Sequence, residues 1–339
     1  MEKVLTVVVP AYNAQDFLRK NLSSFCNSSI LSDIDILIIN DGSSDNTRYI
    51  AEEYMNEYPN SFRVINKENG GHGSGINAGI QNAQGRYFKV VDADDWVDAK
   101  AFEKLVQTLK TSRADVIYSG FLWAIEKKVN EKKYYWMKPE IKEPFKGVIY
   151  EHLYEFDNIA QQLYMKMHNM TIRTDILRSN NIKIDEHCYY VDLEFITYPI
   201  PYVQTIYFLK NTVYYYRVGS RSQSVNLKKM QSQEENYNKV LDSLLAFYTK
   251  LSSISSCTNR KKAYIASIIG RAVSGKIKIM LSFPRKYGKK QQLKEFDSYL
   301  LKNYPEIYCA NLNLAVDFLR KSHYWLFSVA SILVKIIYL

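Results

Sequence analysis

The sequence predicts an α/β fold, a mainly parallel and doubly wound sheet, followed by an α-helical C-terminal region. Three observations support this prediction. In the first half, short apolar runs alternate with segments of helical spacing. From about residue 231 onward, the apolar residues recur at helical spacing alone. The 339 residues, 47% apolar and 24% charged, can bury a sizeable core, which excludes a disordered or collagen-like chain.

The first half has four predicted strands, over residues 5–9, 34–39, 62–65 and 87–91. Helices are predicted between them, over residues 14–26, from a cap at Ser44 or Asp45 to about residue 58, and from a glycine-rich loop to about residue 82. Ligands of such sheets bind at the carboxyl ends of the strands. Polar residues at these strand ends are therefore the candidates for function.

The sharpest chemical feature follows the fourth strand, where Asp92, Asp94 and Asp95 place three carboxylates within four residues. Carboxylates this close repel one another and are hard to leave without a compensating cation. Oxygen ligands suit Mg²⁺ or Mn²⁺. The alternative is a solvated turn that caps a helix starting near Asp98.

A glycine-rich loop, Asn69-Gly70-Gly71-His72-Gly73-Ser74-Gly75, follows the third strand. A dinucleotide-binding fingerprint would normally follow the first strand of its unit, so we disfavour that interpretation. The glycines still allow a backbone to approach a ligand closely. We interpret His72 as a polar loop residue, with substrate contact as the alternative.

Four segments carry a resemblance to a known family: residues 9–13 (VPAYN), 40–45 (NDGSSD), 69–71 (NGG) and 92–95 (DADD). In order and spacing, over about residues 4–110, they resemble the inverting family 2 glycosyltransferases of the GT-A fold, of the kind that builds bacterial surface polysaccharides. The resemblance implies a GT-A domain, a nucleotide-sugar donor that is usually UDP-linked, and Mn²⁺ or Mg²⁺ as cofactor.

The resemblance also assigns roles to individual residues. It implies nucleotide binding by Pro10, Ala11, Tyr12, Asn13, Asp41, Asn69 and Asp92, and metal binding by Asp94. A carboxylate at Asp41 can accept the N–H of uracil. One departure stands out: many relatives have Ala-Arg-Asn after the glycine loop, where this chain has Gly75-Ile76-Asn77. Another basic group must replace that arginine.

Arg217 and Arg221 are the candidates for this replacement. They lie in residues 214–224, which follow a strand-like run over 205–208 and are similar to the family's Tyr-Arg…Ser-x-Ser segment. Either guanidinium could neutralise the leaving diphosphate and so count as nucleotide-binding. The alternative is that both are ordinary surface arginines of a basic region.

An inverting transfer needs a base to take the proton of the acceptor hydroxyl. Residues 189–195 resemble the family's Glu-Asp-x-x-Phe segment, with Val191 in place of the Glu, and this makes Asp192 the predicted base. Asp192 and Glu194 would share a face on a strand but diverge on a helix. A structural acid at a helix start is the alternative. We assign no role to His168, which lies where relatives often carry a Trp-x-Lys segment.

The charge is unevenly distributed along the chain. Residues 1–209 hold 23 Lys and Arg against 28 Asp and Glu, whereas residues 210–339 hold 22 against 7. We predict a GT-A domain over residues 1–225 and a basic helical region over 226–339. The apolar tail, residues 323–339, is too short to span a bilayer, which takes ~20 residues. It suits attachment to an anionic membrane surface. Packing on the domain, or on a second copy in a homodimer, is the alternative.

Together these features predict a cytoplasmic enzyme, peripheral on the inner face of the cell membrane, since no signal peptide opens the sequence. Its acceptor would be a growing cell-surface glycan or a lipid-linked molecule. A sugar-nucleotide nucleotidyltransferase is disfavoured because residues 10–13 replace its signature loop. A catalytically dead assembly partner is disfavoured by the intact Asp41, Asp92 and Asp94. We expect no nucleic acid partner.

Overall fold

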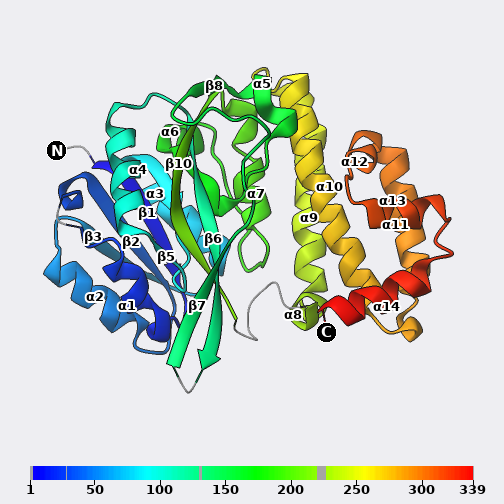
Figure 1. The fold of residues 1–339 in the computed structure, drawn as a ribbon, viewed down its shortest axis with the longest axis horizontal. Helices are drawn as coiled ribbons and strands as arrows, with labels where there is room; N and C mark the ends of the chain where they lie inside the picture. The colour runs from blue at the N-terminus through cyan, green and yellow to red at the C-terminus, as the bar shows by residue number, and fades with distance from the viewer. Residues whose placement is uncertain (1–2, 28, 130–131, 220–226, 339) are drawn as a thin grey trace. The chain divides into compact units, whose positions relative to one another are not determined.

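The computed structural model describes residues 3–27, 29–129, 132–219 and 227–338 (Figure 1). The chain divides into two compact units, an N-terminal unit of residues 1–219 and a C-terminal unit of residues 220–339. Each unit has its own secondary structure: a mixed sheet with helices in the first, and helices in the described part of the second.

Among the described residues, ten strands of the N-terminal unit form one mixed sheet, in the order β3-β2-β1-β4-β9-β6-β10-β5, with β7 beside β6 and β8 beside β10. They are β1 (Lys3–Ala11), β2 (Ile34–Asp41), β3 (Phe62–Lys67), β4 (Gly85–Val90), β5 (Trp96–Val97), β6 (Val116–Val129), β7 (Lys132–Pro139), β8 (Leu153–Glu155), β9 (Met170–Arg173) and β10 (Thr205–Val218). Strands β3, β2, β1 and β4 are parallel, and β9 is antiparallel to both of its neighbours. All four predicted strands are present.

The α-helices of this unit are α1 (Gln15–Ser23), α2 (Thr47–Glu57), α3 (His72–Asn82), α4 (Ala99–Thr111), α5 (Phe156–Ile159), α6 (Thr174–Ser179) and α7 (Asp192–Thr197). Short 3₁₀ turns are η1 (Leu31–Asp33), η2 (Ala160–Gln162), η3 (Met167–Asn169) and η4 (Ile200–Tyr202). Helix α2 begins at Thr47, and Asp45, one of the two predicted caps, accepts a hydrogen bond from the N–H of that residue (2.9 Å). Helix α4 begins beside Asp98, as expected, and Asp98 itself caps it by accepting from the N–H of Ala101.

The apolar runs of the strands are buried because helices cover both faces of the sheet. Leu5, Val7 and Val9 of β1 lie in one core with α1, α2 and α4. Val8 points to the other face, where a Cβ on Gly79 of α3 would lie 2.5 Å from it. This alternation is the period of two expected of a strand, and burial on both faces is typical of a parallel sheet.

Strand β10 is longer than the sequence suggested. The predicted run over residues 205–208 continues to Val218, with irregular pairing to β6 between Phe208 and Tyr214. Tyr214 and Arg217 are therefore strand residues, whereas the sequence placed them after the strand. This continuation brings both side chains to the acidic turn that follows β4.

The described part of the C-terminal unit is helical, as predicted. Its helices are α8 (Leu227–Ser232), α9 (Glu234–Lys250), α10 (Asn259–Ser282), α11 (Lys289–Asn303), α12 (Pro305–Cys309), α13 (Leu314–Lys321) and α14 (Phe327–Tyr338), with 3₁₀ turns η5 (Leu251–Ser253) and η6 (Arg285–Tyr287). Helix α10 packs against α8, α9, α11, α12 and α14. The apolar residues that recur at helical spacing on these helices are buried, among them Leu241, Leu244 and Leu245 on α9 and Ile265, Ile268 and Ile269 on α10. Within the described ranges, we find no helix with the length and apolar character needed to cross a bilayer.

Candidate active site

The carboxyl ends of β1 and β2 are joined by hydrogen bonds between the loops that follow them. The backbone N–H of Asn13 donates to Oγ of Ser43 (3.0 Å), and the N–H of Ser44 donates to Oδ1 of Asn13 (2.9 Å). Asn13 adopts a positive φ of 47°, which Asn tolerates better than most residues. Pro10 and Ala11 are the buried last residues of β1. Tyr12, which follows them, is 56% exposed and available to a ligand.

Asp41, the last residue of β2, is the acceptor around which the glycine loop is arranged. Its Oδ1 accepts from Nζ of Lys67 (2.8 Å) and from the N–H of Gly70 (2.9 Å), and its Oδ2 accepts from the N–H of Gly71 (2.8 Å). Asn69 donates to the backbone carbonyl of Asp41. Asp41 is 3% exposed, so these bonds compensate a buried carboxylate. Asp41 and Asn69, two of the predicted nucleotide-binding residues, are thus in contact.

The acidic turn after β4 is held by side chains from distant parts of the chain. Nδ2 of Asn21 donates to the carbonyls of Asp92 (3.0 Å) and Asp95 (2.9 Å). Asp95 is 1% exposed, and its carboxylate accepts from the hydroxyl of Tyr214 and from the N–H of Arg217 (2.7 Å). Burial, together with the charges of the other two acids, raises the pKa of Asp95 well above its usual value.

Asp92 is paired with a histidine of the glycine loop. Nε2 of His72 lies 2.8 Å from Oδ1 of Asp92. Burial lowers the pKa of His72, but the charge and hydrogen bond of Asp92, together with the charges of Asp192 and Asp94, raise it overall. In return His72 lowers the pKa of Asp92. The structure therefore makes His72 a site residue on the first turn of α3, where the sequence favoured a polar loop residue.

Asp94 is paired with Arg217. Nη2 of Arg217 lies 3.1 Å from Oδ2 of Asp94, and its Nη1 lies 3.5 Å from Oε2 of Glu126. The guanidinium also stacks on Phe17, 3.9 Å from the ring centroid. Arg217 is 4% exposed and is no free surface arginine. Burial and the charge of Asp92 raise the pKa of Asp94, although Arg217 opposes this. Arg221 lies outside the described residues.

One cluster of possible metal ligands contains a histidine, His168. One donor atom each from Asp92, Asp95 and His168 lies within 4.8 Å of the others. Both ring nitrogens of His168 are buried without a hydrogen-bond partner in the described part of the chain. The ring is surrounded by three aromatic rings, Phe121, Tyr214 and Tyr216. Burial lowers the pKa of His168 to about 4, which leaves a neutral imidazole at pH 7.

The segment that precedes α7 is tied to the glycine loop. Asn77 of α3 donates to the carbonyl of Ile184 (2.8 Å) and accepts from its N–H (2.9 Å). The N–H of His187 donates to the carbonyl of Gly70 (2.5 Å). A Cβ on Gly73 would lie 2.0 Å from the carbonyl oxygen of Asp185, so only glycine permits this approach. These contacts place the start of α7 beside His72 and Asp92.

Asp192 is the first residue of α7, and its carboxylate lies among the charges of the site. Burial raises its pKa to about 6; the charge of Asp92 also raises the pKa, while His72 and Lys166 lower it. Lys166 itself is held by Glu140, with Nζ to Oε1 at 2.6 Å. A carboxylate with this pKa is largely ionised at pH 7 and can accept a proton.

Glu194 does not share this environment. Because residues 192–197 are helical, Glu194 points away from Asp192, and it is fully buried. Its carboxylate accepts from the N–H of Asp185 (2.8 Å) and from the hydroxyl of Tyr198 (3.1 Å). Glu194 therefore stabilises the turn that leads into α7.

Lys89 is not among the residues predicted from the sequence. This residue of β4 is fully buried, and its Nζ donates to the carbonyls of His168 (2.8 Å) and Met170 (3.3 Å). Burial lowers its pKa to about 7. A lysine inside the apolar run that precedes the three acids is the signal that could have revealed it. Lys89 ties the His168 turn to the strand that carries the acids.

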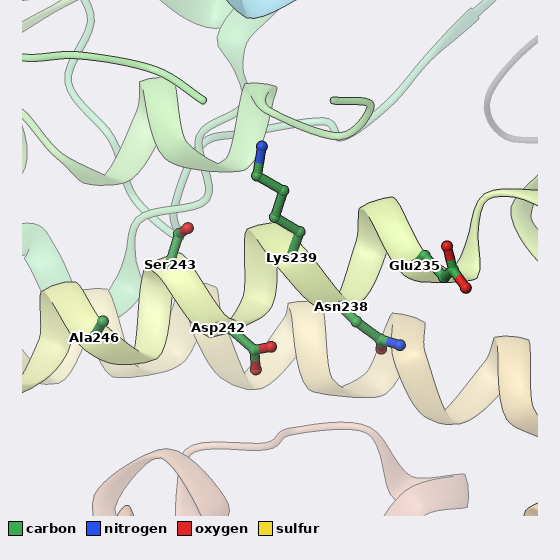
Figure 2. A pocket seen from close by; sticks show the side chains of 6 residues that line it. All are labelled: Glu235, Asn238, Lys239, Asp242, Ser243 and Ala246. Atoms are coloured by element: carbon green, nitrogen blue, oxygen red, sulfur yellow. The ribbon is translucent and has the colours of Figure 1, made fainter. Parts of the chain in front are cut away.

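A shallow pocket on the C-terminal unit is formed by α9 itself. Its lining residues recur at helical spacing along one face of the helix: Glu235, Asn238, Lys239, Asp242, Ser243 and Ala246 (Figure 2). The face carries both acidic and basic side chains. Asp41, Asp92, Asp94 and Asp192 all belong to the N-terminal unit, so this pocket contains none of the candidate site residues.

Comparison with known proteins identifies the family to which the chain belongs. The mixed, mainly parallel sheet with the acidic turn after β4 matches the fold of GT-A glycosyltransferases. The profile described as Glycosyl transferase family 2 matches residues 6–180, and the chain belongs to that family. It is similar to the uncharacterized glycosyltransferase EpsJ of Bacillus subtilis, with 26% identity over 276 residues, 78% of this chain and 75% of EpsJ. It is also similar to the minor teichoic acid biosynthesis protein GgaB of the same organism, at 26% identity over 74% of this chain but only 26% of GgaB.

Solved structures share the fold. Residues 1–349 of Staphylococcus aureus TarS, in complex with UDP-GlcNAc, match 98% of this chain and 89% of theirs, with a TM-score of 0.59 and 16% identity. The mannosyltransferase PcManGT of Pyrobaculum calidifontis, in complex with GDP-Man and Mn²⁺, matches 99% of this chain and 88% of its own, with a TM-score of 0.50 and 11% identity.

Proposed function

We propose that this glycosyltransferase moves a sugar, with inversion, from a UDP-linked donor to a hydroxyl of a growing cell-surface glycan or a lipid-linked acceptor, with Mn²⁺ or Mg²⁺ as cofactor. The observation that carries the proposal is the contact of three elements. The acidic turn after β4 meets the glycine loop through His72 and Asp92, and Asp192 lies within the field of both. Donor binding and proton transfer can therefore take place at one site.

The nucleotide is proposed to bind at the ends of β1 and β2. Oδ2 of Asp41 accepts one hydrogen bond, from Gly71, and a carboxylate oxygen can accept a second, such as that of a uracil N–H. The exposed ring of Tyr12, together with Pro10, Ala11 and Asn13, lies at the neighbouring strand end. The similarity to TarS, solved with UDP and with UDP-GlcNAc, supports a UDP-linked donor.

Asp94 is proposed as the metal ligand, with Asp92 close to the ribose. Asp94 lies in the same turn as Asp92 and Asp95, which with His168 form a group of donor atoms that could hold a divalent cation. Both nitrogens of the neutral His168 imidazole are unpartnered among the described residues. Asp94 is outside this group, because its carboxylate is paired with Arg217. When bound, Mn²⁺ or Mg²⁺ would neutralise charge on the leaving diphosphate. Arg217, 3.1 Å from Asp94, is proposed to supply the basic group that the Gly75-Ile76-Asn77 segment lacks.

Asp192 is proposed as the base. It takes the proton of the acceptor hydroxyl as that oxygen forms a bond to the anomeric carbon, and the bond from this carbon to the diphosphate breaks, releasing UDP. The charges of His72 and Lys166 favour the ionised form of Asp192. Attack from the side opposite the leaving group inverts the configuration.

The acceptor is proposed to be a surface polymer or its lipid-linked precursor, reached at the inner face of the cell membrane. The relation to GgaB, which is named for minor teichoic acid biosynthesis, supports a polymer product. Because the chain spans only about a quarter of GgaB, this support concerns the shared region. A homodimer remains a prediction.

The test is calorimetric titration of the full chain with UDP and GDP, with Mn²⁺, with Mg²⁺ and with excess EDTA, followed by a screen of nucleotide-sugars for hydrolysis. We expect metal-dependent binding of UDP and weaker binding of GDP. Binding of UDP that is indifferent to metal would contradict the cofactor. Preference for GDP would contradict the proposed donor.

A further inference from the structure

We propose that the C-terminal unit binds the surface of an anionic lipid bilayer through an apolar surface on α13 and α14. This α13–α14 surface consists of Phe318, Trp325, Val329, Ile332, Leu333 and Ile336, which are between 52% and 84% exposed. None of its residues belongs to the candidate active site, so the inference goes beyond the transfer chemistry. It identifies the part of the molecule that would reach a membrane.

Helix α14 exposes apolar residues on its outer face and buries a polar residue, the reverse of an ordinary surface helix. Val329, Ile332, Leu333 and Ile336 recur at helical spacing and are exposed, whereas the hydroxyl-bearing Ser331 is only 6% exposed. A helix on the surface of a soluble protein normally exposes its polar face. Among the described residues, nothing covers the outward apolar face of α14.

The apolar surface extends beyond α14. Helix α13 packs against α14 and exposes Phe318 to 63%, and Trp325, between the two helices, is 84% exposed. Large contiguous apolar patches on a protein mark contacts with another protein or with a membrane. Tryptophan is enriched where a polypeptide meets the headgroup region of a bilayer.

The charge of the C-terminal unit favours a membrane over another protein as the partner of this surface. The C-terminal unit, residues 220–339, holds 20 Lys and Arg against 7 Asp and Glu. Nζ of Lys335 on α14 donates to the carbonyl of Phe283 (3.3 Å), which joins α14 to a segment with the exposed Lys286 and Lys290. A second copy would bring two strongly positive units together. An anionic bilayer instead attracts such a unit.

The length of α14 determines how deeply the helix can enter the bilayer. Helix α14 has 12 residues, or about 18 Å at 1.5 Å per residue, against a hydrocarbon core of about 30 Å. The helix is therefore placed in the interface, parallel to the membrane, with its apolar face toward the acyl chains.

The experiment is flotation of the full chain with vesicles of phosphatidylcholine alone or mixed with phosphatidylglycerol, at low and high salt. We expect at least tenfold more protein on the anionic vesicles, with partial release at high salt. Ile332→Glu combined with Ile336→Glu should abolish flotation, and Lys286→Glu with Lys290→Glu should weaken it at low salt. Leu153→Glu, which replaces an exposed leucine of the N-terminal unit, is the matched control and should float as the wild type does.

Several outcomes would overturn the inference. They are wild-type protein that ignores anionic vesicles, equal flotation with neutral vesicles, and undiminished flotation of the Ile332/Ile336 variant. A wild-type dimer that this variant converts to a monomer would make the surface an interface between copies. UDP binding is measured on each sample, so failure of the donor site is distinguished from failure of this surface. If the variant does not fold, brominated lipid provides a second test on the wild type. Brominated lipid should quench the tryptophan fluorescence of the wild type, and Trp325→Phe should reduce this quenching. Absence of quenching in the wild type would contradict the inference.

Discussion

The guanidinium of Arg217 and the carboxylate of Asp94 form an ion pair, with Nη2 3.1 Å from Oδ2. The residue proposed for the diphosphate thus holds the residue proposed for the metal. His72 and Asp92 form the equivalent pair at 2.8 Å. Each of these two acids is therefore compensated by a basic side chain of the protein itself. A divalent cation that binds Asp94 must compete with Arg217, and this relationship can be tested from both sides.

Removing the carboxylate tests the acid. We expect Asp94→Ala to abolish Mn²⁺- or Mg²⁺-dependent turnover, because the proposed ligand is lost. The fold should survive, since Arg217 keeps Glu126 at 3.5 Å and its stacking on Phe17. Donor turnover and circular dichroism are the measurements. Full activity of this variant, or of the wild type in excess EDTA, would contradict the assignment of Asp94.

Removing the guanidinium of Arg217 tests whether it competes with the metal ion for Asp94. Arg217→Met should bind Mn²⁺ more tightly in the absence of donor, by about fivefold, which corresponds to about 1 kcal/mol. Its turnover should nevertheless fall, since no positive charge remains to oppose the diphosphate. Calorimetric titration with Mn²⁺ and a donor assay separate the two effects. Weaker Mn²⁺ binding by Arg217→Met would show that Arg217 supports the metal site instead of competing with it.

Asp41 should affect both the nucleotide and the fold. Asp41→Ala is expected to weaken UDP binding by about 1–3 kcal/mol, the usual cost of stranding a hydrogen-bond partner. It should also lower the melting temperature, because Gly70 and Gly71 lose their acceptor. Asp41→Asn keeps one oxygen acceptor, so its UDP affinity and melting temperature should lie between those of the wild type and of Asp41→Ala. Unchanged UDP affinity in calorimetry, with a lowered melting temperature, would leave Asp41 a purely structural residue.

The sequence predicted the elements whose signals are local. The strands that end at Ala11, Asp41 and Val90 are buried apolar runs, and the polar residues after them mark the site. It missed the side chains that reach the site from far along the chain. The hydroxyl of Tyr214 meets Asp95, 119 residues earlier, and no periodicity reports such a pairing.

Two further differences between the prediction and the structure have tertiary causes. The predicted strand ended at Phe208, whereas β10 continues through Lys210 and Asn211 by irregular pairing with β6. His72 lies in a glycine-rich segment typical of a loop, yet it begins α3 and so faces Asp92. Both differences arise because tertiary contacts, which a local pattern does not contain, set the course of the backbone.

Lys89 should matter for stability. Lys89→Met keeps the apolar part of the side chain but leaves the carbonyls of His168 and Met170 without their donor. We expect a loss of about 1–3 kcal/mol in the free energy of unfolding, measured by urea denaturation at pH 7. Because burial lowers the pKa of Lys89 to about 7, the unfolded chain binds more protons than the folded one above pH 7. Lys89 therefore makes the wild type more stable as the pH rises from 7 towards 10, and the methionine variant should lack this gain.

Asp192 should control the chemical step and its dependence on pH. Asp192→Asn keeps the shape of the side chain and removes its basicity, so kcat should fall by about 10²–10⁴ with little change in donor Kd. In the wild type, kcat should rise as the pH increases through about 6, because only the ionised carboxylate accepts a proton. Lys166 lowers the pKa of Asp192, so Lys166→Met should move this rise to higher pH. Lys100→Met, which removes an exposed lysine of α4, should leave it in place. Collapse of donor binding in Asp192→Asn, or a pH profile unmoved by Lys166→Met, would make Asp192 a structural acid at the start of α7.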